Sequence, residues 1–250
     1  GRAMDDFDAF GKYLDDLAAS GRRLRLWLRD DDAVAPSGAL DRLLSVMNRN
    51  AVPGLLAVIP AQCTPALAER LASEPMARVA THGWAHQNHQ PPEMKKAEFG
   101  AERPHADSLS DLRRGYGAIE AAFGARALPV FVPPWNRIGP EIADALPKAG
   151  FKALSAFGST SPGPVHRINA HVDLIDWRGT RGGRAAAPLL AAFRDWAETD
   201  EPAVGFLTHH LVHDDAAWGF VERFLTLTSG HPGSEWVSPS TLLEEAARAP

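Results

Sequence analysis

Three groups of polar residues in this chain each follow a short apolar run, and their side chains are of the types that bind metal ions and transfer protons. They are three consecutive aspartates at 30–32, the pair His82 and His86, and His209. One carboxylate and two histidines form a three-ligand set that leaves a divalent cation open to water, as a hydrolytic metal requires. These residues therefore predict a metallohydrolase.

Each group also has a purely structural explanation. Aspartates are common in turns, but carboxylates crowded at the end of a buried strand repel one another unless a cation or a proton intervenes. The i, i+4 spacing of His82 and His86 places two side chains on one face of a helical turn, and such a pair is often incidental. The aspartates on a neighbouring strand are what favour a metal site here. Trp135 and Trp177 are either core residues or flat platforms for a sugar ring.

The elements that must position these residues alternate along the chain. Apolar runs predict strands near 24–28, 54–59, 77–81, 128–132, 152–156, 172–175 and 204–208. Helical periodicity fits the segments between them, for example 40–47, 109–123, 140–149, 188–196 and 218–227. This alternation predicts βα units and a parallel sheet. About seven strands in 250 residues favour a (β/α) barrel over an open sheet, as one domain that spans 1–250.

The polar groups follow the carboxyl ends of the predicted strands. Besides the three groups above, Pro-Pro-Trp-Asn at 133–136 follows one strand, and Asp176 with Trp177 follows another. In a parallel barrel these ends lie on one face, where such barrels carry their chemistry. The polar, proline-containing segment 87–107 has no period and predicts a long loop beside the site.

Composition excludes several classes of protein. The net charge is -5 and the sequence pI about 6.1, so neither nucleic acid nor an anionic membrane is an expected partner. Cys63 is the only cysteine, which excludes an intramolecular disulfide and a cysteine-based zinc cluster. No apolar stretch can span a bilayer, and the first residues lack the pattern of an export signal, so we expect a cytoplasmic protein.

The order of these motifs resembles that of a known family. Asp-Asp, then His-x-x-x-His, a Pro-rich aromatic turn, Asp-Trp and Leu-x-His follow one another over residues 28–210, as in the polysaccharide deacetylases of carbohydrate esterase family four. The resemblance implies a distorted barrel of about seven strands and a bound divalent metal, with Zn²⁺ as the first expectation. It also implies hydrolysis of an N-acetyl group from an amino sugar or acetylated saccharide.

The resemblance also implies a role for individual residues. Asp31 is then the general base, and Asp32, His82 and His86 hold the metal that activates water. A register one residue earlier, with Asp30 and Asp31 as the two acids, stays open. His209 is implied as the general acid, and Asp176 as the carboxylate that fixes its tautomer and raises its pKa. The implied substrate contacts are Pro134, Trp135, Asn136, Trp177 and Leu207, with a backbone N–H of the 134–136 turn facing the oxyanion.

The chain departs from the family pattern at two positions. Gly83 stands where Ser or Thr is usual, and Val132 stands where the family has an arginine that pairs with the catalytic base. Arg29 and Arg137 are the nearest arginines in sequence that could replace it. These departures indicate a divergent branch, whose substrate is not inherited from the best-known members.

Three other functions fit parts of the pattern. The same scaffold could hydrolyse a small or cyclic amide, with or without a metal. A glycosidase would use two carboxylates and leave the histidine pair idle. A non-catalytic carbohydrate-binding relic would use Trp135 and Trp177 and hold no metal. The sequence gives no indication of the acyl group or of the oligomeric state.

Overall fold

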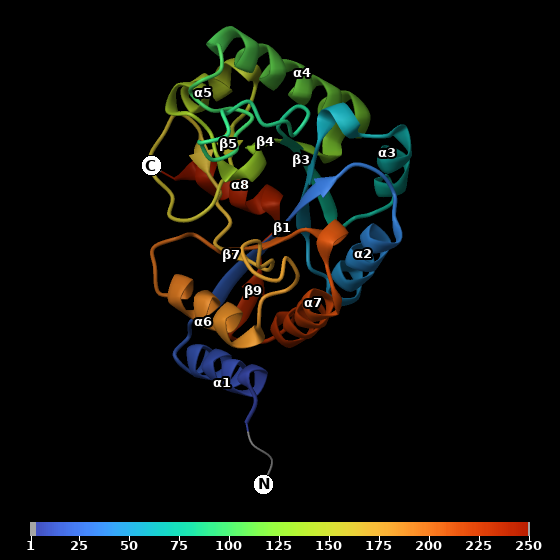
Figure 1. Ribbon diagram of the computed structural model, residues 1–250. Coiled ribbons are helices and arrows are strands. Elements are labelled where there is room, and N and C mark those ends of the chain that lie inside the picture. The colour runs from blue at the N-terminus through green and yellow to red at the C-terminus, as the bar shows by residue number, and fades with distance from the viewer. Residues whose placement is uncertain (1–3, 250) are drawn as a thin grey trace.

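The computed structural model describes residues 4–249, in which strands and helices alternate (Figure 1). The strands are β1 Leu24–Ala33, β2 Gly54–Val58, β3 Ala77–His82, β4 Ala127–Val132, β5 Ala153–Leu154, β6 His166–Arg167, β7 Val172–Asp173, β8 Val204–Thr208 and β9 Ser234–Trp236. The α-helices are α1 Asp6–Ala19, α2 Gly38–Asn50, α3 Pro65–Leu71, α4 His105–Phe123, α5 Pro140–Ala145, α6 Ala186–Ala197, α7 Asp215–Thr228 and α8 Pro239–Arg248. Short 3₁₀ turns include η3 Pro134–Asn136 and η5 His210–Val212.

The strands form one parallel sheet that curls round on itself. Its order is β6-β5-β4-β3-β2-β1-β8-β7, and β9 pairs with the start of β1. The two ends of this path belong to one stretch of chain, residues 166–173. The Ile168 N–H donates to the Leu154 carbonyl of β5, and the Leu174 N–H donates to the Leu207 carbonyl of β8. The predicted distorted parallel barrel in a single domain is therefore confirmed, with helices around its outside (Figure 1).

Apolar packing supports the barrel on both faces of the sheet. On the outside, Phe193 of α6 stacks on Phe224 of α7, with ring centroids 4.3 Å apart. On the inside, Trp27 packs with small and branched side chains of the other strands, and Leu242 of α8 covers them. Because side chains alternate along a strand, Arg29 and Asp31 follow Trp27 into the interior toward the carboxyl ends. The interior thus changes from apolar to charged where the site lies.

β1 is longer than the sequence predicted, and the aspartates lie within it. Its pairing with β2 shifts between Asp31 and Ala33, and Asp32 has a φ of 79°. Such a bulge interrupts the alternation of side chains. As a result Asp31 and Asp32 both reach the same cavity, while Asp30 is buried on the other face.

The other predicted elements are confirmed in position but not always in length. Strands 54–59, 77–81, 128–132 and 204–208 match β2, β3, β4 and β8 within a residue or two. The strands predicted at 152–156 and 172–175 shrink to the two-residue β5 and β7. The expected loop runs from residue 83 to 104 without a named helix or strand, and α4 then begins at His105. No helix in the described part of the chain is long and apolar enough to cross a membrane.

Candidate metallohydrolase site

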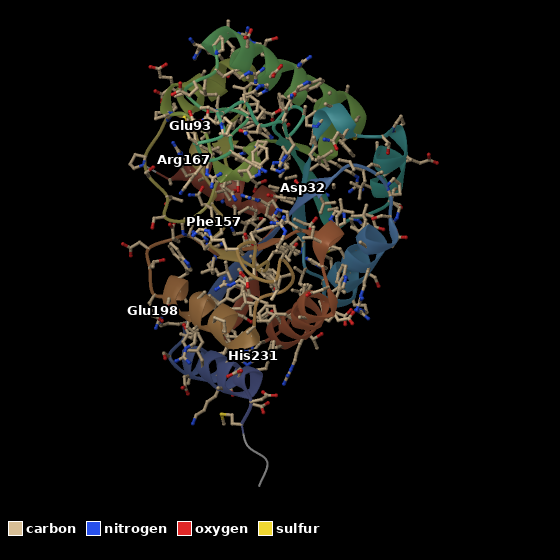
Figure 2. All side chains as sticks on the ribbon, viewed as in Figure 1. Asp32, Glu93, Phe157, Arg167, Glu198 and His231 are labelled. Carbon is tan, nitrogen blue, oxygen red and sulfur yellow. The ribbon has the colours of Figure 1, made fainter. Side chains whose placement is uncertain are left out.

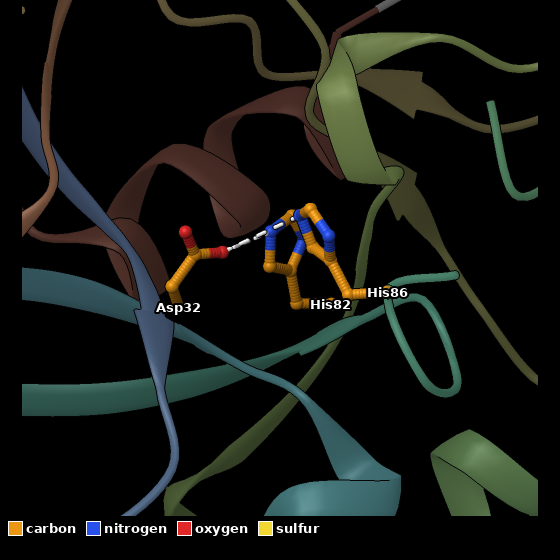
Figure 3. Close-up of side chains that lie close together, drawn as sticks. All are labelled: Asp32, His82 and His86. Carbon is orange, nitrogen blue, oxygen red and sulfur yellow. Dashed lines mark hydrogen bonds and ion pairs between the residues drawn. The ribbon is translucent and has the colours of Figure 1, made fainter. Parts of the chain in front are cut away.

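Asp32, His82 and His86 meet at the carboxyl ends of β1 and β3 (Figure 3). Asp32 Oδ1 lies 3.0 Å from Nε2 of His82 and 3.5 Å from Nε2 of His86. One ligand atom from each residue lies within 4.8 Å of the others. Figure 2 shows Asp32 beside the central sheet, whereas His231, which has no predicted role, lies near α1 and faces Asp15 at 2.9 Å. The structure thus brings together the three residues predicted as metal ligands.

The hydrogen bonds of His82 show that this group suits a cation. Its Nδ1 lies 2.8 Å from the carbonyl oxygen of Val132 and must donate, so the neutral ring has no proton on Nε2. That lone pair faces the Asp32 carboxylate, and two acceptors meet unless the ring is protonated or a cation lies between them. Burial lowers the pKa of His82, but Asp31 and Asp32 raise it overall. Carboxylate oxygen and imidazole nitrogen are both ligands that Zn²⁺ accepts, and a carbonyl behind a ligating histidine is a usual arrangement.

His82 and His86 do not share the helical turn that their spacing predicts. His82 ends β3, and the chain then bends with a φ of 65° at Gly83 and 56° at His86. A Cβ at Gly83 would meet the ring of Pro134 at 2.6 Å. The positive φ and the lack of space explain why glycine stands where the family has Ser or Thr. The bend, rather than a helix face, turns His86 back toward His82.

Glu98 of the following loop holds this bend, a contact that no sequence pattern predicts. Its buried carboxylate accepts the N–H groups of Trp84 at 3.0 Å, Ala85 at 2.9 Å and Gln87 at 3.2 Å. These bonds satisfy three donors of a segment that forms no regular structure. A single glutamate in a polar loop carries no signal in sequence that would reveal this contact.

Arg29 replaces the arginine that is missing at Val132. Its Nε and Nη2 donate to the two carboxylate oxygens of Asp31 at 2.9 and 3.0 Å, in a fully buried bidentate pair. The other candidate, Arg137, donates to the carbonyl of Lys96 instead. The guanidinium that faces the predicted base therefore comes from the same strand as the base.

Arg29 is itself fixed at every donor that points away from Asp31. Its Nη1 donates to the Ser155 hydroxyl at 2.9 Å and to the carbonyls of Ser155 and Ala156 at 3.1 Å. Its Nη2 also donates to Oδ1 of Asn136 at 2.6 Å. The expected contact residue Asn136 thus binds Arg29 and ties the turn after β4 to the barrel interior.

Asp30 belongs to a different cluster, which decides the register of the aspartates. Its carboxylate bonds to Nδ1 of His210, and accepts the Thr208 hydroxyl at 2.7 Å and the His210 N–H at 2.9 Å. Burial raises the pKa of Asp30, but His210 and Thr208 lower it overall. The side chains of Asp30 and His210 are buried and do not line the cavity. The geometry supports Asp31 and Asp32, not Asp30 and Asp31, as the two acids of the site.

His209 faces the site from the end of β8. Its Nε2 lies 3.8 Å from Oδ2 of Asp31, and its ring packs nearly perpendicular to the Trp177 ring with centroids 4.9 Å apart. Trp177 donates its Nε1–H to Oδ2 of Asp173 at 3.1 Å. Burial raises the pKa of Asp173, and the lowering effects of His209, of the Ile175 N–H and of Trp177 do not reverse this.

The expectation that Asp176 holds His209 is corrected by the structure. Asp176 lies in a turn, where its carbonyl accepts the Arg181 N–H at 2.7 Å and its carboxylate accepts the Thr180 N–H at 3.4 Å. Besides Asp31 and Asp32, the acid that lines the cavity with His209 and Trp177 is Asp173, and Asp176 is not among the described residues that line it. Its sequence signal was a charged residue inside the apolar run of a strand.

The turn after β4 contributes a ring and a strained backbone. Trp135 and Asn136 have φ values of 57° and 55°, and the Trp135 ring lies 4.4 Å from the ring of His86. Pro134 and Leu207 are buried, and neither is among the described residues that line the cavity with Asp32 and His209. Their predicted contact with substrate stays a prediction.

The residues of the site surround a cavity of about 450 Å³. Its walls include the three predicted ligands, Asp31 and His209, with Trp135 and Trp177. That volume is typical of a small-molecule pocket. A carboxylate and two histidines, with a second carboxylate and a third histidine, thus lie together at the carboxyl ends of the strands of a parallel barrel, and these are the types of side chain that metal-assisted hydrolysis uses.

Comparison with known families assigns the chain. The polysaccharide deacetylase model matches residues 24–154, just over half of the 250 residues. The chain belongs to the polysaccharide deacetylase family. This membership places it among hydrolases that act on the amide bond of an N-acetyl group. No curated protein matches it.

Solved structures share the fold at low identity. A Mycobacterium smegmatis protein assigned to the polysaccharide deacetylases has a TM-score of 0.68 at 16% identity, over 91% of each chain. The family 4 carbohydrate esterase from Streptomyces lividans, solved with acetate, has a TM-score of 0.57 at 19% identity, over 87% of this chain and 94% of that one. Peptidoglycan deacetylase PdaC from Bacillus subtilis has a TM-score of 0.58 at 16% identity, over 91% and 92%.

Proposed function

We propose that the protein is a metal-dependent hydrolase that removes an N-acetyl group from an amino sugar or an acetylated saccharide. The observation that supports this most is the position of His82, whose Nε2 lone pair faces the Asp32 carboxylate 3.0 Å away. We assign Asp32, His82 and His86 as the ligands, with Zn²⁺ as the expected ion. A divalent cation held there would lower the pKa of water toward about 7 and polarise the acyl carbonyl.

Proton transfer in this proposal belongs to Asp31 and His209. Oδ2 of Asp31 lies 3.9 Å from Nε2 of His82 and 3.8 Å from Nε2 of His209, between the ligand set and the third histidine. Asp31 accepts a proton from the attacking water, while Arg29 fixes its orientation. Protonated His209 then donates to the departing amine, which is otherwise a poor leaving group.

The turn after β4 supplies the donor for the developing oxyanion. Pro134 has no N–H, and the Asn136 N–H already donates to the Pro133 carbonyl at 3.0 Å. The N–H of Trp135 is therefore the donor that we assign to this role. The positive φ of Trp135 is the kind of backbone strain that is found at functional sites.

Trp177 and Asp173 position the acid in this proposal. The Trp177 indole donates its Nε1–H to Asp173 and packs nearly perpendicular to the His209 ring. Trp135 and Trp177 both line the cavity, and we assign their rings as platforms for a sugar ring. A glycosidase would have no use for His82 and His86, whereas here both of these histidines contact Asp32.

Elemental analysis of metal content, combined with an assay of acetate release on the same proteins, tests this proposal. Wild type, His86→Ala and the matched control His105→Ala, an exposed histidine at the start of α4, are purified with Zn²⁺ present. We expect about one divalent ion per chain in wild type and control, and loss of both ion and acetate release in His86→Ala. Full metal content in His86→Ala would contradict the ligand set. A wild type that holds no metal, releases no acetate and still binds sugar would favour a non-catalytic carbohydrate-binding protein. Acetate release from small amides, but not from sugars, would favour a hydrolase of small or cyclic amides.

A further inference from the structure

The rim of the cavity carries four cations, although the chain as a whole is acidic. Lys96, Arg137, Arg178 and Arg181 line it together with the aspartates and histidines of the site. None of these four takes part in an ion pair with another residue in the described range 4–249. These four cations outnumber the three carboxylates that line the same cavity, Asp31, Asp32 and Asp173, although the net charge of the chain is -5.

Two of the cations lie over the two aromatic rings of the cavity. The Lys96 ammonium lies 6.0 Å from the Trp135 ring centroid, and the Arg181 guanidinium lies 5.5 Å from that of Trp177. Each ring also contacts a histidine of the site, His86 for Trp135 and His209 for Trp177. A sugar ring on either platform would have its reacting group at the histidine and its outer substituents at the cation.

Arg181 is held in place at the cost of backbone strain. It is exposed, yet it has a φ of 61°, a conformation that side chains other than glycine rarely adopt. Its N–H donates to the Asp176 carbonyl, and its Nη1 donates to the Trp177 carbonyl at 3.5 Å. The Asp176 turn therefore presents Arg181 and Arg178 to the cavity. Strain of this kind is found at ligand sites more than at neutral surface.

We propose that the substrate is an acylated amino sugar with an anionic substituent, a carboxylate or a phosphate, bound by these rim cations. This inference rests on the proposed function, because it takes the reacting group to lie at Asp31 and His209. A guanidinium binds either anion with two parallel hydrogen bonds, so the shared chemistry is a planar or tetrahedral oxyanion. Arg178 and Arg181 set this specificity, and Lys96 and Arg137 add to the attraction.

The test compares charged and neutral substrates by kcat/KM for acetate release at low salt. The probes are an N-acetylglucosamine oligomer, the same oligomer with a lactyl ether carboxylate, and N-acetylglucosamine 6-phosphate. We expect a charged probe to exceed the neutral oligomer by about five- to tenfold, from two exposed ionic contacts. This ratio falls as salt is added. The better charged probe identifies carboxylate or phosphate as the group recognised.

The double variant Arg178→Gln/Arg181→Gln should bring the ratio close to 1. The control Arg23→Gln/Lys148→Gln removes the same charge from exposed positions outside the cavity and should keep the wild-type ratio. A wild-type ratio near 1 at low salt, or a ratio unchanged in the cavity variant, would overturn the inference.

If no probe releases acetate, the proposed function fails, and binding decides the inference by itself. Quenching of tryptophan fluorescence then compares the Kd of charged and neutral sugars. Equal Kd values would overturn the role of the cations. A charged sugar that binds about fivefold more tightly in wild type, and not in the cavity variant, would support it.

Discussion

Two acid–histidine clusters lie on opposite faces of β1 and are built from neighbouring residues. Asp30 and His210 are buried, and the Asp30 carboxylate is satisfied by His210 and Thr208. Asp32 lines the cavity, where its carboxylate faces Nε2 of His82 and Nε2 of His86. The lone pairs of these three groups point at one another and are available to a cation. The same residue types thus stabilise the fold on one face and are left available for a ligand on the other. Solvent access and the bulge at Asp32, rather than residue type, separate the two.

The largest expected effect distinguishes two adjacent aspartates. Asp31→Asn should lower turnover by about 10² or more, because a general base typically contributes that much, while the metal stays bound. Asp30→Asn should instead lower the free energy of unfolding by about 3 to 5 kcal/mol, because it breaks a buried pair. Kinetics and urea unfolding of both variants measure the contrast. Near wild-type turnover in Asp31→Asn on a confirmed substrate would contradict its role.

The two adjacent histidines should divide in the same way. His209→Ala removes the proposed acid and should lower turnover by about 10² or more with metal content unchanged. His210→Ala leaves Asp30 buried without its partner and should mainly cost stability. Metal analysis and melting curves separate the two effects. If His210→Ala lost more turnover per folded molecule than His209→Ala, the assignment of the two clusters would be reversed.

How far the sequence predicted this arrangement depends on the range of each interaction. The strand-end positions of Asp32, His82 and His209 followed from local periodicity and the geometry of parallel strands. The bulge at Asp32 and the bend at Gly83 depend on contacts with other strands and with Glu98, which no local pattern encodes. Asp173 was missed and Asp176 chosen for the same reason, since only the fold decides which acid faces His209.

Arg29 allows the site to be rebuilt in the form usual for the family. Arg29→Leu leaves Asp31 without its buried partner, and we expect turnover to fall about 10- to 100-fold, as on loss of other groups that orient a reacting residue. Adding Val132→Arg returns a guanidinium to the position where the family has one. Turnover of the double variant should recover in part, and that of Val132→Arg alone should not rise. Recovery with Val132→Lys to the same level would show that charge alone, without bidentate geometry, is sufficient.

Glycine at position 83 connects the bend to the ligands. Gly83→Ala places a Cβ against Pro134 and forces a positive φ, which should cost about 1 to 3 kcal/mol of stability and weaken metal binding through His82 and His86. Gly117→Ala is the matched control, since nothing lies within 4 Å of its Cβ in α4, and it should be stabilising by about 0.5 to 1 kcal/mol. Metal titration with thermal unfolding measures both. Equal metal affinity in the two variants would separate the bend from the ligand set.

The smallest effect concerns His213, a histidine beside the buried cluster of Asp30 and His210. The pKa of His213 is lowered to about 4, chiefly by burial and also by the nearby His210 and His209. The negative charges of Asp30 and Asp214 raise it, but by less. Its Nε2 accepts the His209 N–H at 3.4 Å, and only an unprotonated nitrogen can do so.

Because its folded pKa lies below the unfolded value of about 6.5, the unfolded chain binds the extra proton between these values. The stability that neutral His213 contributes is therefore present above pH 6.5 and is lost as pH falls toward 4. The slope is at most about 1.4 kcal/mol per pH unit. His213→Gln should reduce the pH dependence of urea unfolding by up to one proton over that window, and an unchanged slope would show that His213 is charged in the fold. A reduced slope with metal affinity intact would assign this proton to the buried cluster around Asp30 and His210, and not to the cluster of Asp32, His82 and His86 at the cavity.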